Sequence, residues 1–472
     1  MSRARRFAGT LGAVVALSVQ IFAGGARAEG PPAGAPAGGS DAQADTLPGR
    51  AAVPPAVELP KLLTLEESLR ILRTPGLDLL IAGAQVMSAE ADLVNAGAVA
   101  NPNATVQLGP TFNYSSSPPG GCSGCAQYFV QWGLSDNAAI MDFVSGKRGL
   151  RVKAARAALA AARLGRADAE RNLGSQVKQQ YAQVVLARAT LDFYREVQDT
   201  MTKTLELNKL RYPRMIDEGG LARVEIQKLE ADQGVSTATM TLRQAQVGLA
   251  FLLGVRTATP DFDVEKTLLK LRVPASLGGA TGGSEQTLFE LALNNRPDLK
   301  AQGYQRVRSG EALALAKRTQ FPDVTLNMQY SQLGMGQNVG QPMSIIFGAS
   351  MNLPVFYQQQ GEIRRARADA DTQALQYEKN IAQVASDLST AYAGFKANRE
   401  LVERMEATLL GRAKTARDIL EKQYRAGNAS LMDFLDAERT YISTNIEYLQ
   451  DLTAYWTALF QLEQAVGIEE LK

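Results

Sequence analysis

The chain has 472 residues, with 50 Lys and Arg against 48 Asp and Glu, and it contains no histidine. The near balance of charge argues against a nucleic-acid partner, and the lack of histidine excludes Ser-His-Asp catalysis, Cys-His catalysis and His-ligated zinc. Its two cysteines are too few for a metal site built from cysteines alone, so we expect no metal, no other cofactor and no enzyme activity.

Residues 1–28 have the pattern of a secretory signal peptide. The basic start is followed by mostly apolar residues 7–22, and Ala26-Arg27-Ala28 supplies a cleavage pattern. A membrane anchor is the alternative, but the apolar run is short for a spanning helix. Residues 29–60, which are rich in Pro, Ala and Gly, are predicted to form a flexible lead-in.

The rest of the chain contains the same series of patterns twice. Thr-Leu-Glu-Glu at 64–67 is matched by Thr-Leu-Phe-Glu at 287–290, and further matches follow at offsets between 213 and 223 residues. Such spacing indicates an internal duplication. We therefore predict a first repeat at 61–255, a connector at 256–286 and a second repeat at 287–469.

Each repeat is expected to contain a short helix, a longer helix, two strands, a very long helix, and a returning helix after a turn. In the order of the chain, the helices are predicted at 64–74, 77–99, 146–212, 220–254, 287–296, 298–320 and 361–424. At about 1.5 Å per residue, the first very long helix spans roughly 100 Å. A helix of that length cannot be buried in a globule, so it needs lateral partners in a coiled-coil-like array.

Four runs alternate apolar and polar residues, at about 104–114, 127–135, 324–333 and 343–353. Alternation of this kind gives a strand one apolar and one polar face. Each run is about ten residues long, the length that a tilted strand needs to cross a bilayer. Pro110 lacks an N–H donor and indicates a bulge or a weaker strand. A soluble β-sandwich is the alternative, although it usually has more strands in sequence.

The predicted sheet is too small to close on itself in lipid. Beyond the lead-in no run of 18 or more apolar residues occurs, so insertion into a membrane must use strands. An open four-stranded sheet leaves edge N–H and C=O groups unpaired, and transmembrane barrels start at about eight strands. The chain must therefore oligomerise, and a homotrimer would supply a 12-stranded β-barrel above a long helical tube.

The duplicated series resembles the outer membrane efflux protein family, the TolC-like channels, over about residues 62–469. The motifs that carry the resemblance are Thr64-Leu65-Glu66-Glu67, Asn101-Pro102-Asn103, Gly146-Lys147-Arg148, Tyr424-Arg425-Ala426-Gly427-Asn428-Ala429-Ser430 and Asp433-Phe434-Leu435-Asp436-Ala437-Glu438. The resemblance implies a mainly α fold with a transmembrane β part, in which a trimer continues its barrel as a long periplasmic α-helical barrel. Ser145-Gly146-Lys147-Arg148 is similar to the CzcC-like heavy-metal branch.

The same resemblance implies a location in the outer membrane of a Gram-negative bacterium, in contact with its lipid and with a large periplasmic part. It implies passive export of small molecules or metal cations that an inner-membrane pump and a periplasmic adaptor protein deliver. A duct for type I protein secretion is one alternative, because the same architecture serves both. A periplasmic coiled-coil scaffold is another, but it leaves the four amphipathic strands unexplained.

The tips of the two helical hairpins are expected at Gly219 and Gly220 and at Gly427 and Asn428. Glycine permits the positive φ values that a tight reversal needs. By resemblance, the adaptor contacts these tips; ordinary turn chemistry is the simpler explanation, and the two are compatible.

Three acids near the tips are candidates for the pore constriction. Asp433 and Asp436 share a helix face because they are three residues apart, and Glu225 is the matching acid of the first repeat. In a trimer each would form a ring of carboxylates, which attracts cations. By resemblance, Tyr424 belongs to the network that closes this end. Ordinary solvated helix faces are the alternative.

The basic partner that the family has two residues after the tip glycine is missing here, since Ala429 occupies that position. Arg425 and Arg223 are the candidate replacements.

Cys122 and Cys125 lie in the loop between the first two strands, which should face the cell exterior. In an exported chain a local disulfide is favoured. A redox-active pair would need a βαβ setting, and a metal contact through two thiolates has little support.

Overall fold

The computed structural model describes residues 57–73, 76–110, 128–214, 216–256, 262–274, 284–333 and 343–468. The predicted signal peptide, most of the lead-in and the pair Cys122 and Cys125 lie outside these residues, as do residues 111–114 and 127 of the first two predicted strands. The described residues all belong to one compact unit. None of the described helices is long and apolar enough to span a bilayer.

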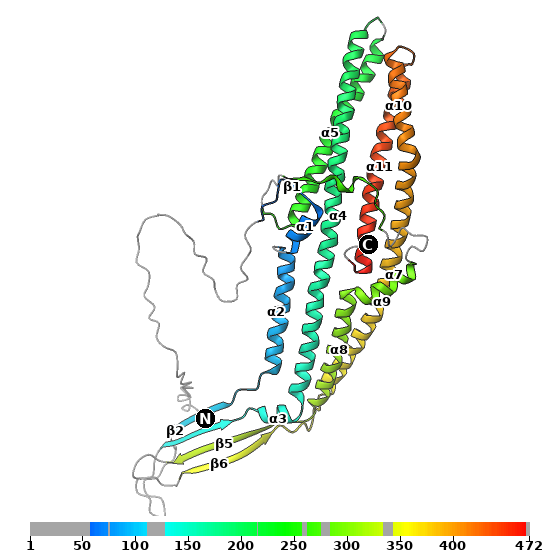
Figure 1. Ribbon diagram of the computed structural model, residues 1–472. Coiled ribbons are helices and arrows are strands. Elements are labelled where there is room, and N and C mark those ends of the chain that lie inside the picture. The colour runs from blue at the N-terminus through cyan, green and yellow to red at the C-terminus, as the bar shows by residue number, and fades with distance from the viewer. Residues whose placement is uncertain are drawn as a thin grey trace, which may run out of the picture. The chain divides into compact units, whose positions relative to one another are not determined.

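Long helices dominate both halves of the sequence (Figure 1). Those of the first half are α1 (Leu65–Arg73), α2 (Leu77–Gly97), α3 (Ala139–Val144), α4 (Lys147–Arg211) and α5 (Glu218–Leu252). Those of the second half are α7 (Glu285–Asn295), α8 (Pro297–Arg318), α9 (Gln360–Arg404), α10 (Leu410–Arg425) and α11 (Leu431–Val466). Both α2 and α5 pack along α4, and α8 and α11 pack along α9, which confirms the prediction of long helices with lateral partners.

The second very long helix differs from its prediction. We expected one continuous helix over 361–424, but a π-helical turn, η2 (Met405–Leu409), separates α9 from α10. A π turn accommodates one extra residue, so the side chains of α10 are rotated relative to those of α9. Periodicity alone does not reveal such an insertion, because the residues on both sides keep helical spacing.

The strands form an antiparallel sheet in the order β2 (Asn103–Pro110), β3 (Tyr128–Ser135), β5 (Val324–Leu333) and β6 (Ser344–Met351). The register places Val106, Trp132, Tyr330 and Ile345 side by side across all four strands. Val106 and Ile345 are 72% and 62% exposed, whereas a soluble sandwich would bury this apolar face.

Pro110 is the last paired residue of β2, which is an edge strand of this sheet. Pairing with β3 runs without interruption from Asn103 to Pro110, so the bulge that we considered for this position is absent. Proline is tolerated there because Pro110 is the last residue of an edge strand.

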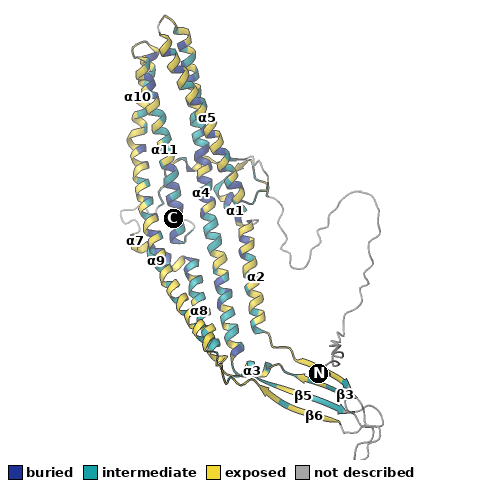
Figure 2. Ribbon diagram, turned by 180° about the vertical axis from the view of Figure 1, so that it is seen from behind, coloured by how far each residue is buried: buried dark blue, intermediate teal, exposed yellow. Residues whose placement is uncertain are grey.

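The connector is more ordered than its glycine-rich composition indicates. Residues 262–274 include β4 (Asp263–Val264), which pairs with β1 (Leu62–Leu63), and the short helix η1 (Lys266–Leu269). Trp456 Nε1 donates to the carbonyl of Leu268 at 2.7 Å, and Tyr455 donates to that of Arg272 at 2.6 Å. Figure 2 shows the buried residues concentrated where α4 and α11 meet this part of the connector.

The motif Gly146-Lys147-Arg148 joins the helices to the sheet. Gly146 has a φ of +73° and precedes α4. Lys147 is only 5% exposed, and its Nζ donates at 2.8 Å to both the Phe321 carbonyl and Asp323 Oδ1. The Arg148 guanidinium donates twice to the Gly97 carbonyl at the end of α2. The motif therefore fixes α4 to the start of β5 in the other half of the chain.

Replacing Lys147 with Met is expected to lower the free energy of unfolding by about 2 kcal/mol, since it removes charge-assisted hydrogen bonds and leaves a carbonyl unpaired. Asp323 is half-exposed and can be hydrated, which keeps the loss moderate. Denaturant unfolding of the purified protein in detergent measures this change. Lys153→Met, at an exposed position of α4, is the matched control and should change little; equal losses in both variants would contradict the anchoring role.

Candidate functional site

The tips of the two long hairpins contact each other through Arg211, the last residue of α4. Its guanidinium donates to the carbonyl of Tyr424 at 3.3 Å and to that of Arg425 at 2.9 Å. Both acceptors lie at the C-terminal end of α10, where helix carbonyls lack intrahelical donors. A cation at this end also interacts favourably with the helix dipole. Arg211 thus caps a helix that belongs to the other hairpin.

Tyr424 is the centre of this contact. It is 5% exposed, and its hydroxyl donates to Oδ1 of Asn208, which is fully buried in α4. Its ring stacks on that of Phe434 with 5.4 Å between centroids, and the Arg211 guanidinium lies 5.0 Å from the ring centroid. We call Tyr424, Asn208 and Arg211 the tip latch, because these residues connect the two hairpins by hydrogen bonds and a cation–π contact.

The second tip is built around Gly427, which has a φ of +81° as expected. Its N–H donates to the carbonyl of Tyr424 at 3.0 Å, and that of Asn428 donates to the carbonyl of Gln423 at 2.8 Å. Backbone bonds of this kind satisfy the last carbonyls of a helix. Ser430 then caps α11 by accepting from the N–H of Asp433 at 3.1 Å.

The first tip uses its glycines differently from our expectation. Gly219 and Gly220 lie in the first turn of α5, and neither has a positive φ. Asp217 caps this helix by accepting from the N–H of Gly220 at 2.9 Å. A Cβ on Gly220 would lie 2.9 Å from Asp217 Oδ1 and would displace the capping carboxylate, so the glycine favours the cap and does not serve the reversal.

The three candidate acids are all exposed, but they differ in their contacts. Asp433 accepts a hydrogen bond from the Ser430 hydroxyl at 2.7 Å, so it belongs to the cap of α11. Within the described part of the chain, the carboxylates of Asp436 and Glu225 have no hydrogen bond or ion pair. Asp433 and Asp436 lie together at the start of α11, whereas Glu225 belongs to α5.

Neither candidate replacement for the missing basic partner contacts the Tyr424 side chain within the described residues. Arg425 pairs with Glu421 at 2.6 Å, and Arg223 approaches the sulfur of Met432 at 3.0 Å. Arg211 has the contact instead, and our sequence reasoning missed it. The available signal was a cation in the last turn of a helix, directly before Tyr212 and Pro213.

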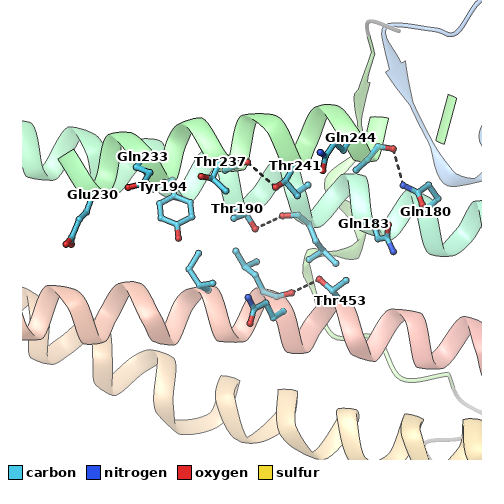
Figure 3. A pocket seen from close by; sticks show the side chains of 18 residues that line it. Gln180, Gln183, Thr190, Tyr194, Glu230, Gln233, Thr237, Thr241, Gln244 and Thr453 are labelled. Atoms are coloured by element: carbon cyan, nitrogen blue, oxygen red, sulfur yellow. Dashed lines mark hydrogen bonds between the residues drawn. The ribbon is translucent and has the colours of Figure 1, made fainter. Parts of the chain in front are cut away.

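A hollow of about 850 Å³ lies farther along the hairpins, between α4, α5 and α11 (Figure 3). Glutamine and threonine side chains dominate its wall, and Glu230 is the charged residue among those that line it. Tyr194 lies against Gly234, where an added Cβ would come within 2.5 Å of the ring. Gln183 and Thr190 point into the hollow, while Tyr181 points from α4 toward β1 and donates to the carbonyl of Leu63 at 3.1 Å.

These features define a class of protein. Two matching sets of long helices, joined to a four-stranded sheet whose apolar face is exposed, form the subunit of a TolC-like outer-membrane channel. The model of the outer membrane efflux protein family matches residues 73–255 and 288–468, and the chain belongs to this family. It therefore resides in the outer membrane, with a large periplasmic part.

Individual relatives are distant but cover most of the chain. The cobalt-zinc-cadmium resistance protein CzcC of Cupriavidus metallidurans is 22% identical over 409 residues, which make up 86% of this chain and 90% of CzcC. The structure of CusC aligns with a TM-score of 0.69 at 18% identity, over 86% of this chain and 92% of CusC. VceC from Vibrio cholerae aligns with a TM-score of 0.68 at 19% identity, over 85% and 96%. These structures show the same fold.

Proposed function

We propose that the chain forms a homotrimeric channel of a tripartite efflux system, which passively exports small molecules or metal cations that a periplasmic adaptor and an inner-membrane pump deliver. The observation that carries the proposal is the tip latch, since a contact between hairpins at the end of a tube is suited to a gate. Both repeats, 61–255 and 287–469, contribute to it.

Two unpartnered surfaces support association with further copies. The sheet ends at β2 and β6, whose outer edges have no neighbour among the described strands. On α5, exposed apolar residues recur at helical spacing on the side away from its bundle partner; they are Ile226, Leu229, Met240, Val247 and Phe251. Three chains would pair these edges and bury these stripes, which stabilises an oligomer in membrane and water alike.

The acids and the tips have separate proposed roles. In a trimer, Asp436 would form a carboxylate ring at the periplasmic end, with Asp433 beside it and Glu225 as the acid of the first repeat. Such a ring concentrates cations, and the name of the CzcC relative includes three divalent metals. The exposed turns at Gly219 and at Gly427 and Asn428 are the proposed contact with the adaptor.

The combined variant Asp433→Asn with Asp436→Asn is expected to weaken block of the current by multivalent cations at least tenfold in a planar bilayer. Because Asp433 is already bonded to Ser430, Asp436→Asn alone should account for most of the change. Asp371→Asn, an exposed acid near the start of α9 and thus at the end of the helix away from the tip, is the control. No current from the unmodified protein would reject the channel, whereas current with unchanged block in the variants would reject only the ring.

A further inference from the structure

The α10–α11 hairpin, which contains Tyr424 of the tip latch, has a buried carboxyl group, that of Glu438. It lies in a stripe of apolar and aromatic side chains. On α11, Phe434, Leu435, Glu438 and Ile442 follow each other at intervals of one, three and four residues, so they share the face that packs on α4 and α10. Phe434 is 1% exposed, and Glu438 is 2% exposed. A carboxylate is almost never buried so fully without a partner, because desolvation disfavours its charge.

The nearest cation does not satisfy this carboxyl group. Arg417 Nε of α10 lies 3.9 Å from Glu438 Oε2, which is too far for a hydrogen bond. Neither atom has a hydrogen-bond partner in the described structure. The guanidinium instead lies 4.3 Å from the ring centroid of Tyr441 on α11.

Arg417 is also shared with other acids. It lies 3.2 Å from Asp418 Oδ1 and 3.7 Å from Glu421 Oε2, both on its own helix. The charged and titratable groups that face Glu438 are Arg417, Asp418 and Glu421 from α10, Glu196 from α4, and Tyr441 from α11. Arg425, which is exposed, also pairs with Glu421 at 2.6 Å. Two arginines against four carboxyl groups still leave the site short of positive charge.

These surroundings favour the protonated carboxyl. Burial raises the pKa of Glu438 to about 7, and the neighbouring acids act in the same direction while Arg417 opposes them. The group therefore titrates within the ordinary range of periplasmic pH, in which an unperturbed carboxyl stays ionised.

We propose that Glu438 is a proton-binding site that controls how the α10–α11 hairpin packs on α4, and thereby whether the tip latch holds. With its proton, the side chain is neutral and fits the buried stripe. When the proton leaves for solvent, a buried anion faces Glu421 and Glu196, so the hairpin must shift to admit water or to bring Arg417 into hydrogen-bond range. Phe434 lies one turn away and stacks on Tyr424, so this shift reaches the latch. The inference rests on the proposed channel function.

The test is the bilayer current of the intact protein between about pH 5.5 and pH 8.5. The unmodified channel is expected to pass about tenfold more current at the upper end, with a midpoint near the pKa of about 7. Glu438→Gln keeps the shape of the neutral side chain, so its current should stay at the low-pH level throughout. Arg417→Gln should move the midpoint to higher pH, because it removes the cation that favours the anion. Glu447→Gln, an exposed acid of α11, is the matched control and should behave as the unmodified protein.

A second measurement does not depend on conduction. Infrared difference spectra between acid and alkaline pH should contain the C=O band of a protonated carboxyl that disappears with a midpoint near 7 and is missing in Glu438→Gln. If this band persists unchanged in Glu438→Gln, or if the current flows but its pH dependence survives in that variant, the proton site is refuted. If no variant conducts at any pH, the proposed function fails, and the infrared band alone then decides whether the site binds a proton.

Discussion

Replacing Tyr424 with Phe and Arg211 with Gln is expected to leave the channel largely open. Phe keeps the stack on Phe434 but cannot donate to Asn208, whose buried oxygen then lacks its donor. Gln in place of Arg211 removes the charged cap of α10. A neutral hydrogen bond contributes about 1 kcal/mol, and one from a charged group about 1.5–3 kcal/mol.

The assembly multiplies this effect. If opening requires the latches of three chains to break together, the double variant removes roughly 7–12 kcal/mol from the closed state. The whole of that range exceeds about 5.5 kcal/mol, the amount that turns a ratio of 1:99 into 99:1, so a mostly closed population becomes a mostly open one. Single-channel recordings in a planar bilayer measure the open fraction directly.

A matched control lies close to the latch in sequence. Arg214 is exposed three residues beyond Arg211, so Arg214→Gln removes the same charge without touching the latch. Its open fraction should equal that of the unmodified protein. If the effects of Tyr424→Phe and Arg211→Gln on the free energy of opening add up, the two contacts act independently. A coupled latch predicts that the double-mutant cycle is not additive. A double variant that assembles normally yet stays closed would refute the latch.

Much of the fold could be predicted because its signals are local. The helix expected at 146–212 is observed as α4 (Lys147–Arg211), since Gly146 and Pro213 mark its ends in the sequence. The strands likewise follow from alternation, and the register places most of their apolar residues on one face. The same register assigns the positions of Phe129, Leu333 and Ile346 to the other face. The duplication also shows each pattern of helices and strands twice, so each element is predicted from two segments of the sequence.

Features that depend on contacts between distant segments were not visible. The connector looked like a linker because its C-terminal part is glycine-rich, yet Phe262, Val264 and Leu268 are buried against α4 and α11. Arg211 could not be identified as the partner of Tyr424, since 213 residues separate them. We predicted that Gly219 permits the chain reversal at the first tip, but the cap of α5 by Asp217 fixes that tip. Tertiary contact decided each case, and local propensity did not.

Glu438 belongs to a motif that we named in the sequence, but we assigned it no role there. Its replacement is expected to have a large effect on the free energy of unfolding. Glu438→Gln is expected to stabilise the protein by about 3 kcal/mol at pH 8.5 and to leave its stability nearly unchanged at pH 4. The carboxyl titrates at its ordinary value of 4.5 when unfolded and at about 7 when folded. Each pKa unit corresponds to about 1.4 kcal/mol between the two protonation states.

The sign follows from proton linkage. Below about pH 4.5 the carboxyl is protonated in both states and does not affect the balance. Between about pH 4.5 and pH 7 the unfolded chain loses its proton first, so the folded state binds more protons and stability falls as the pH rises. Above that range both states are ionised and the loss of stability is complete, whereas glutamine carries no charge at any pH. Denaturant unfolding in detergent at both pH values, with Glu447→Gln as control, measures the difference. A gain of similar size at pH 4 would instead indicate better packing of the amide and would contradict a buried titrating carboxyl.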